Sequence, residues 1–105
     1  MAFSAKLEKT ADTAVITLAG ELDTAAAMIF KGEVEQATVD RPQRLVLMMQ
    51  DLSYLASACL RVLVFAKQKM GPQVDVYVIA AQEQVLDTLQ KTGFDRGCIV
   101  QDVYA

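Results

Sequence analysis

Hydrophobic and polar residues alternate over residues 3–9, which is the period-two pattern of a half-buried strand. A second strand-like run covers residues 13–19, and the short polar segment between the two runs predicts a hairpin. Gly20 is expected to end the second strand. Asp23 or Thr24 follows at a helix start, where either side chain can accept hydrogen bonds from the free N–H groups of the first turn.

After the hairpin, amphipathic segments alternate with apolar runs, so we expect helices at 25–37, 57–70 and 82–92 and strands at 44–49 and 74–81. The apolar stripe of the first helix is expected to comprise Met28, Ile29, Val34 and Ala37. The strand at 44–49 is continuously apolar, as expected for a strand buried on both faces. Gly71-Pro72 and Gly93 are helix stops. Residues 99–104 form either a last strand or a docked segment.

This order, β-β-α-β-α-β-α with a tail, predicts one α/β domain over residues 1–105. Strands that alternate with short helices pair in parallel through right-handed crossovers. The initial hairpin makes the sheet mixed, and βα repeats follow it with their helices packed on the sheet. No linker, internal repeat or low-complexity tract interrupts the chain.

Composition narrows the possible functions. The chain has 105 residues, with 10 Lys and Arg against 13 Asp and Glu, for a formal charge of −3. That balance disfavours direct nucleic-acid binding, because phosphate backbones are held by basic surfaces. The chain has no His, so neither a Ser-His-Asp nor a Cys-His nucleophile system can be built from it. Its five glycines form no nucleotide-binding motif, and we expect no catalytic residues and no cofactor.

Cysteine and methionine usage favours structural roles over metal binding. Cys59 and Cys98 form no CxxC pair, and both are expected to be reduced and buried, as in a cytoplasmic protein. Four methionines, at positions 28, 48, 49 and 70, are spaced as separate core positions, so no metal site is expected. No apolar run reaches the length of about 18 residues that a membrane-spanning helix needs, so neither a span nor a signal peptide is predicted.

The segment 51–61 is the most informative one, because it follows a buried strand and opens a helix. In an open α/β sheet this position is the carboxyl edge, where ligands and partners bind. Ser57 stands at the helix start. Its hydroxyl is either an ordinary N-cap or a functional group beside the positive end of the helix dipole.

Gly20-Glu21-Leu22-Asp23 after a hairpin, then a buried strand, then an apolar residue with Ser57-x-x-Leu60 opening a helix, resembles the STAS domain of bacterial anti-sigma factor antagonists. The segment 89–95 is similar to the helix-ending segment of that family, and the resemblance covers nearly the whole chain. It implies a single STAS domain.

In that family, an Asp-Ser-Ser/Thr-Gly signature opens the helix, and an anti-sigma factor kinase phosphorylates its first hydroxyl. The resemblance places that hydroxyl on Ser57, and Asp23 matches the acidic residue beside the phosphorylation site. This chain departs from the signature at Ala56, Ala58 and Cys59, which stand for the acid, the second hydroxyl and the glycine. If Ser57 is not modified, the chain is a constitutively binding copy.

A helical wheel of the second helix adds a docking surface. Cys59, Val62, Leu63, Ala66 and Met70 share the arc assigned to the core. Ser57, Arg61, Lys67 and Gln68 lie opposite, and Val64 and Phe65 fall within or beside this polar arc. Apolar residues rimmed by polar ones are typical of a protein-binding patch, although a helix buried on several sides gives the same pattern. Arg61 can pair with a phosphate or with an acidic partner.

The resemblance implies a non-enzymatic, cytoplasmic anti-sigma factor antagonist. Its dephosphorylated form would bind an anti-sigma factor serine kinase and so release a sigma factor, and a PP2C-type serine phosphatase would reset Ser57. The partner surface is expected to comprise Asp23, Ser57, Arg61, Val64, Phe65 and Gln68. The alternative is an unmodified STAS scaffold or accessory subunit of a stress-signalling or lipid-transport complex. A small enzyme is a third possibility, but no motif in the sequence supports it.

Overall fold

A computed structural model describes residues 3–10, 12–39, 42–71 and 74–103. Its five strands are β1 (Ser4–Lys9), β2 (Thr13–Leu22), β3 (Arg44–Leu55), β4 (Asp75–Ile79) and β5 (Ile99–Gln101). Its helices are α1 (Ala27–Val39), α2 (Leu60–Met70) and α3 (Glu83–Thr92), with 3-10 turns η1 (Ser57–Cys59) and η2 (Phe94–Gly97). The predicted order of elements is confirmed.

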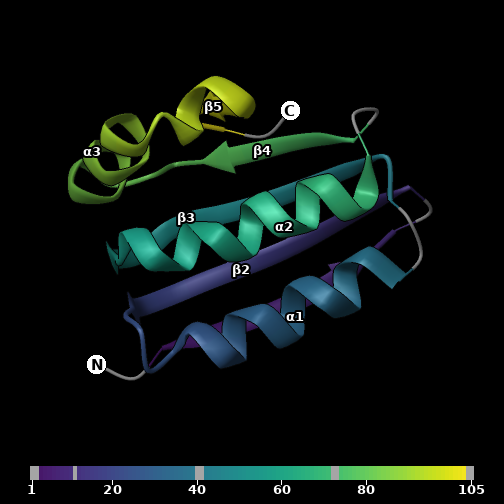
Figure 1. The fold of residues 1–105 in the computed structure, drawn as a ribbon, viewed down its shortest axis with the longest axis horizontal. Coiled ribbons are helices and arrows are strands. Elements are labelled where there is room, and N and C mark those ends of the chain that lie inside the picture. Colours follow the sequence, from purple (N-terminus) through teal and green to yellow (C-terminus); the bar gives the residue numbers. More distant parts are fainter. Residues whose placement is uncertain (1–2, 11, 40–41, 72–73, 104–105) are drawn as a thin grey trace.

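The strands form one mixed sheet in the order β1-β2-β3-β4-β5. β1 pairs antiparallel with β2, as the hairpin prediction requires, and every later pair is parallel. Figure 1 shows α1 and α2 lying side by side across one face of this sheet. Val85 and Leu89 of α3 join the same buried cluster as Phe30 of α1 and Leu63 of α2, so α3 covers that face too.

Two strands run further than their sequence predicts. Gly20 does not end β2, which continues to Leu22 through a register shift between Gly20 and Glu21. Gly20 has a φ of 88°, which is the left-handed conformation that a glycine bulge uses. β3 likewise continues past Met49 to Leu55, where a linking segment was expected. The Ser53 hydroxyl donates a 3.0 Å hydrogen bond to the Gly20 carbonyl and ties the two extensions together.

The apolar stripe predicted for the first helix is half wrong. Val34 and Ala37 are buried, but Met28 and Ile29 are exposed, and Phe30 packs into the core in their place. α1 begins at Ala27 instead of residue 25, and its core-facing side follows the four-residue spacing of residues 26, 30 and 34. Met28 therefore does not fill the core as its type suggested. Met49 is buried, and Met48 and Met70 are partly buried.

The predicted arc of the second helix is confirmed. Cys59, Leu63 and Ala66 are buried, and Val62 and Met70 pack against the core from partly buried positions. Gly71 ends α2 with a φ of 93°, and Gly93 ends α3 with a φ of 77°, so both glycines are stops as expected. Pro72 lies outside the described residues. The last apolar segment forms β5, a strand parallel to β4, and Tyr104 is not described.

Candidate functional site at the carboxyl edge of the sheet

The turns that carry Asp23 and Ser57 meet at one edge of the sheet. β2 and β3 are parallel, and their last residues, Leu22 and Leu55, are register partners. The Ala56 N–H donates a 2.9 Å hydrogen bond to the Leu22 carbonyl, so the chain leaves both strands at the same level. The carboxyl ends of parallel strands lie at the same edge of a sheet. Asp23 and Ser57, which are 34 positions apart in sequence, therefore lie near the same site.

Asp23 caps the start of α1, and the sequence predicts this role for either Asp23 or Thr24. Its Oδ1 accepts a 2.9 Å hydrogen bond from the Ala26 N–H.

Ser57 does not cap its helix, which corrects the N-cap alternative. Ala56 occupies the N-cap position of η1, and Ser57 is the first residue within the 3-10 turn with no side-chain cap bond. The Ser57 side chain is exposed, and its hydroxyl makes no hydrogen bond to another described residue.

Cys59, the last residue of η1, packs against the turn that carries Asp23 and so connects it to the turn that carries Ser57. Its side chain is 1% exposed, and its Sγ lies 3.4 Å from the Asp23 carbonyl oxygen and 3.8 Å from that of Leu22. Burial, with the nearby Asp23 carboxylate as a second cause, raises the pKa of the Cys59 thiol. The thiol stays protonated at neutral pH and serves as a small packed side chain with a weak donor. Burial of Cys59 is therefore confirmed.

Cys98 differs from the prediction, because it is only partly buried. Its Sγ lies 3.4 Å from the Phe94 carbonyl oxygen. Burial raises its pKa to about 11, the Asp95 carboxylate adds to this increase, and the Lys67 ammonium opposes it. Neither cysteine is in a disulfide. Among the described residues, no group of three or more His, Cys, Asp or Glu side chains is placed to hold a metal ion.

A groove of about 470 Å³ separates α2 from the end of α3 and η2, and we call it the α2–α3 groove. Four of the six predicted partner-binding residues line it together. The lining comprises Ser57, Leu60, Arg61, Val64, Lys67, Gln68, Thr92, Gly93, Phe94 and Gly97. The first six come from η1 and α2, as the helical wheel implies. The other wall, from residues 92–97, has no signal in the sequence, because only tertiary packing brings it there.

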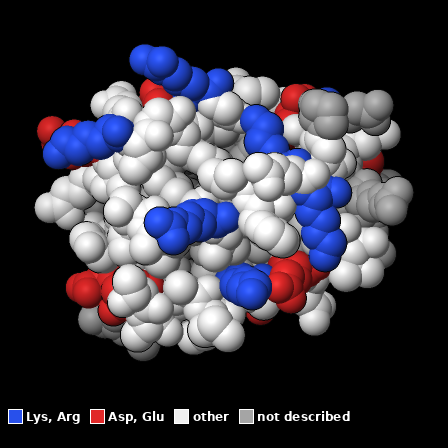
Figure 2. Space-filling view, in the orientation of Figure 1, with Lys and Arg blue, Asp and Glu red and all other residues white. Residues whose placement is uncertain are grey.

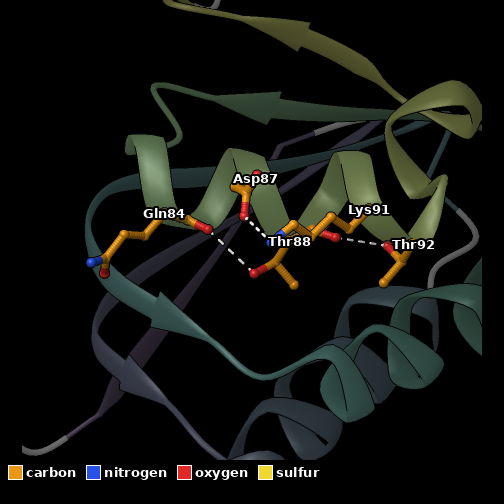
Figure 3. Close-up of polar contacts among 5 residues, drawn as sticks. All are labelled: Gln84, Asp87, Thr88, Lys91 and Thr92. Atoms are coloured by element: carbon orange, nitrogen blue, oxygen red, sulfur yellow. Dashed lines mark hydrogen bonds and ion pairs between the residues drawn. The ribbon is translucent and has the colours of Figure 1, made fainter.

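The polar side chains of this groove divide into satisfied and available ones. Thr92 donates to the Thr88 carbonyl of its own helix at 3.0 Å, one of the local α3 contacts that Figure 3 shows. The Lys67 ammonium donates to the Gly97 carbonyl oxygen. In the described part of the chain, the side chains of Ser57, Arg61 and Gln68 have no such partner. These three groups are available to a bound protein.

Phe65 and Asp23 lie outside the α2–α3 groove. Phe65, 70% exposed, lines a second groove of about 250 Å³ between α1 and α2, here called the α1–α2 groove. Arg61 lines both grooves, and Val64, 44% exposed, belongs to the first. The exposure of Val64 and Phe65 confirms that this helix is not buried on every side. No helix within the described ranges is long and apolar enough to cross a membrane.

Comparison with known proteins identifies this arrangement. Residues 4–104 match the family model of the STAS domain. An anti-sigma factor antagonist from Mycobacterium paratuberculosis has a similar structure, with 20% identity and a TM-score of 0.87, covering 97% of this chain and 87% of that one. No match was found among curated proteins.

Two further solved proteins share the fold. SpoIIAA of Bacillus is 18% identical. Its unphosphorylated form has a TM-score of 0.76 (92% of this chain, 87% of that one), and its phosphorylated form one of 0.70 (92% and 90%). The murine anion transporter Slc26a9, in its inward-facing state, is 21% identical with a TM-score of 0.67, and the match covers 87% of this chain but 16% of the transporter. At these identities, the similarities establish a common fold.

Proposed function

The chain belongs to the STAS domain family, and from this premise we propose that it is an anti-sigma factor antagonist. In its unmodified form it binds an anti-sigma factor serine kinase and thereby releases a sigma factor. Phosphorylation of Ser57 switches that binding off. The chain acts as a protein substrate and binding module, and the kinase supplies ATP and Mg²⁺.

The observation that carries this proposal is that the Ser57 hydroxyl is exposed and does not cap a helix. Ser57 stands at the carboxyl edge of the sheet beside the Asp23 turn, is exposed, and is not used as a helix cap. It also lines the α2–α3 groove together with three further residues predicted to bind the partner. A kinase needs an accessible hydroxyl without a competing structural role, and this position supplies one. Solved structures of SpoIIAA in both phosphorylation states, which share this fold, add support.

The switch we propose is electrostatic. The Ser57 Oγ attacks the γ-phosphorus of ATP held by the kinase, its proton is released, and ADP leaves. The product carries a charge of about −1.5 to −2 and three acceptor oxygens at a helix start that tolerates anions. At an interface the same charge adds repulsion and a desolvation penalty, and each loss of about 1.4 kcal/mol weakens binding tenfold. A PP2C-type phosphatase restores the hydroxyl.

The first test is the intact mass of the protein purified from its own cells, with peptide mapping across residues 55–67. We expect a species heavier by one phosphate, with the modification on Ser57. Detection only of unmodified Ser57 across growth conditions in which the proposed kinase is active would contradict phosphorylation. The stretch 55–67 contains no Ser, Thr or Tyr other than Ser57, so a phosphate found within it is assigned to Ser57 without ambiguity.

The second test measures binding to the anti-sigma factor kinase. Ser57→Asp introduces a negative charge, and Ser57→Asn, of nearly the same size and uncharged, is its matched control. We expect Ser57→Asp to weaken binding about tenfold or more relative to Ser57→Asn, while Ser57→Ala remains close to wild type. Equal affinities of the Asp and Asn variants would remove the electrostatic switch.

A second candidate function is an unmodified STAS scaffold or accessory subunit. The replacement of the acid, second hydroxyl and glycine of the family signature by Ala56, Ala58 and Cys59 favours it. The match of this fold to 16% of an anion transporter chain supports a role as one part of a larger protein. Genes neighbouring that of this chain distinguish the two functions, because a kinase or phosphatase gene supports the switch and transporter genes support the accessory role.

A further inference from the structure

The α2–α3 groove has a one-sided charge. The charged residues among its described lining are Arg61 and Lys67, both basic, although the chain as a whole carries a net charge of −3. Figure 2 shows this helical face, with Lys and Arg side chains over α2 and Asp and Glu side chains around the margins and over α1. A basic groove on an acidic protein complements an acidic segment of a partner.

Only one of the two cations is available. The Lys67 ammonium donates to the Gly97 carbonyl and holds η2 against α2. Arg61 is exposed and makes no ion pair with any described residue. Its guanidinium has five donors in a planar fork, which suits a carboxylate or a phosphate bound through two oxygens. Arg61 also borders both grooves of α2, so an anion paired with it is placed centrally on this face.

Arg61 stands four residues after Ser57, and both side chains line the α2–α3 groove. Ser57 opens the 3-10 turn η1, and Arg61 lies in the first turn of α2, which follows η1 directly. A phosphate on Ser57 and the long, flexible Arg61 side chain therefore face the same groove, which allows the two groups to pair. A phosphate paired with this guanidinium takes up donors and cancels charge that a bidentate carboxylate from a partner would need, so the two anions compete for it.

We propose that Arg61 is the anion-pairing residue of the α2–α3 groove and that two anions compete for it. In the unmodified chain it binds a carboxylate on an acidic, partly apolar segment of the partner, whose apolar side chain packs beside Val64. In the modified chain the Ser57 phosphate captures Arg61. The second state, in which Ser57 is phosphorylated, rests on the proposed function. In this inference the switch is a competition of two anions for the Arg61 guanidinium instead of simple repulsion.

The first experiment uses the isolated chain and needs no partner. Phosphoserine is installed at position 57 by genetic code expansion, and the phosphate pKa, about 6 for a free phosphoserine, is measured by ³¹P NMR titration. Pairing with Arg61 favours the dianion, so we expect the pKa to rise by about 0.3–0.5 unit in Arg61→Gln and to rise less in Arg61→Lys. Lys69→Gln removes the same charge from the same helix away from this groove and should leave the pKa unchanged. Equal values in Arg61→Gln and Lys69→Gln would overturn the pairing.

The second experiment uses the anti-sigma factor kinase that binds the unmodified chain. Arg61→Gln should weaken that binding about tenfold and reduce its salt dependence, whereas Lys69→Gln should change it less than about twofold. Equal effects of the two variants would overturn the partner carboxylate. If no kinase binds the wild-type chain, the proposed function fails, and the ³¹P titration still decides whether Arg61 holds an anion at Ser57.

Discussion

Replacing Cys59 by Gly tests whether this chain needs the glycine that its family resemblance places there. Cys59 has φ −72° and ψ −18°, a right-handed helical conformation that any residue adopts. Glycine therefore offers no relief of strain at this position and adds backbone entropy to the unfolded chain, at a cost of about 0.5–1 kcal/mol relative to Ala. The Cys59 side chain is 1% exposed, so its removal also leaves a gap between the Asp23 and Ser57 turns.

The expected loss follows from these two terms. Two buried groups of about methylene size, Cβ and Sγ, are worth about 0.8 kcal/mol each. With the entropy term, Cys59→Gly should lower the free energy of unfolding by about 2–3 kcal/mol. For a domain of about 100 residues, each kcal/mol lowers the melting temperature by about 4–8 °C, so a decrease of about 10–20 °C is expected.

Urea denaturation followed by far-UV circular dichroism measures this loss, with Cys59→Ala as the matched control. The Ala variant keeps the Cβ and the backbone restriction, so it should lose only the Sγ contribution of about 0.8 kcal/mol, about a third as much. A Gly variant as stable as wild type, or more stable than Cys59→Ala, would refute the reasoning. That result would mean that the turn before α2 gains from glycine in solution, as the family signature suggests.

Three further predictions concern caps and thiols. Gly93→Ala places a side chain at φ 77°, so it should cost about 1–2 kcal/mol in urea denaturation, although the Cβ itself meets open space. Asp23→Ala removes the acceptor for the Ala26 N–H and should cost about 1 kcal/mol, whereas Asp23→Asn should recover most of it; equal losses would contradict the capping role. Cys98, with a pKa raised to about 11 from 9.0, should react with iodoacetamide at pH 8 on the order of a hundredfold more slowly than an unshifted thiol. Its rate should rise with pH up to about 11, and a plateau near pH 9 would contradict the shift.

The alternation of strands and helices was predictable because each element has a strong local pattern. The apolar run 45–47 is buried throughout, and Gly71 and Gly93 end their helices with positive φ. The ends of β2 and β3 were not predictable, since the polar residues after Met49 pair only because the two parallel strands extend together past Gly20. Strand extension of this kind depends on the partner strand and leaves no local signal.

The candidate site was predictable on one wall and not on the other. The helical spacing of Ser57, Arg61, Val64 and Gln68 predicts one exposed face, and the structure places all four on one groove. Phe65 falls on the neighbouring groove, because successive residues are turned by about 100° around a helix. The wall from η2 depends on how α3 ends and packs, which no spacing within α2 can report.

The N-cap interpretation of Ser57 was wrong for a reason that bears on function. A hydroxyl before an apolar helix is a typical cap signal, but here a 3-10 turn precedes α2, so the N-cap residue is Ala56 for that turn and Cys59 for α2. The hydroxyl that local rules would use for helix stability is therefore available for chemistry. Cys59 and the Ala56 N–H hold this turn against the end of β2. Because the turn is held by buried contacts that do not involve the Ser57 side chain, a phosphate there changes the charge of the groove and leaves the fold that presents it intact.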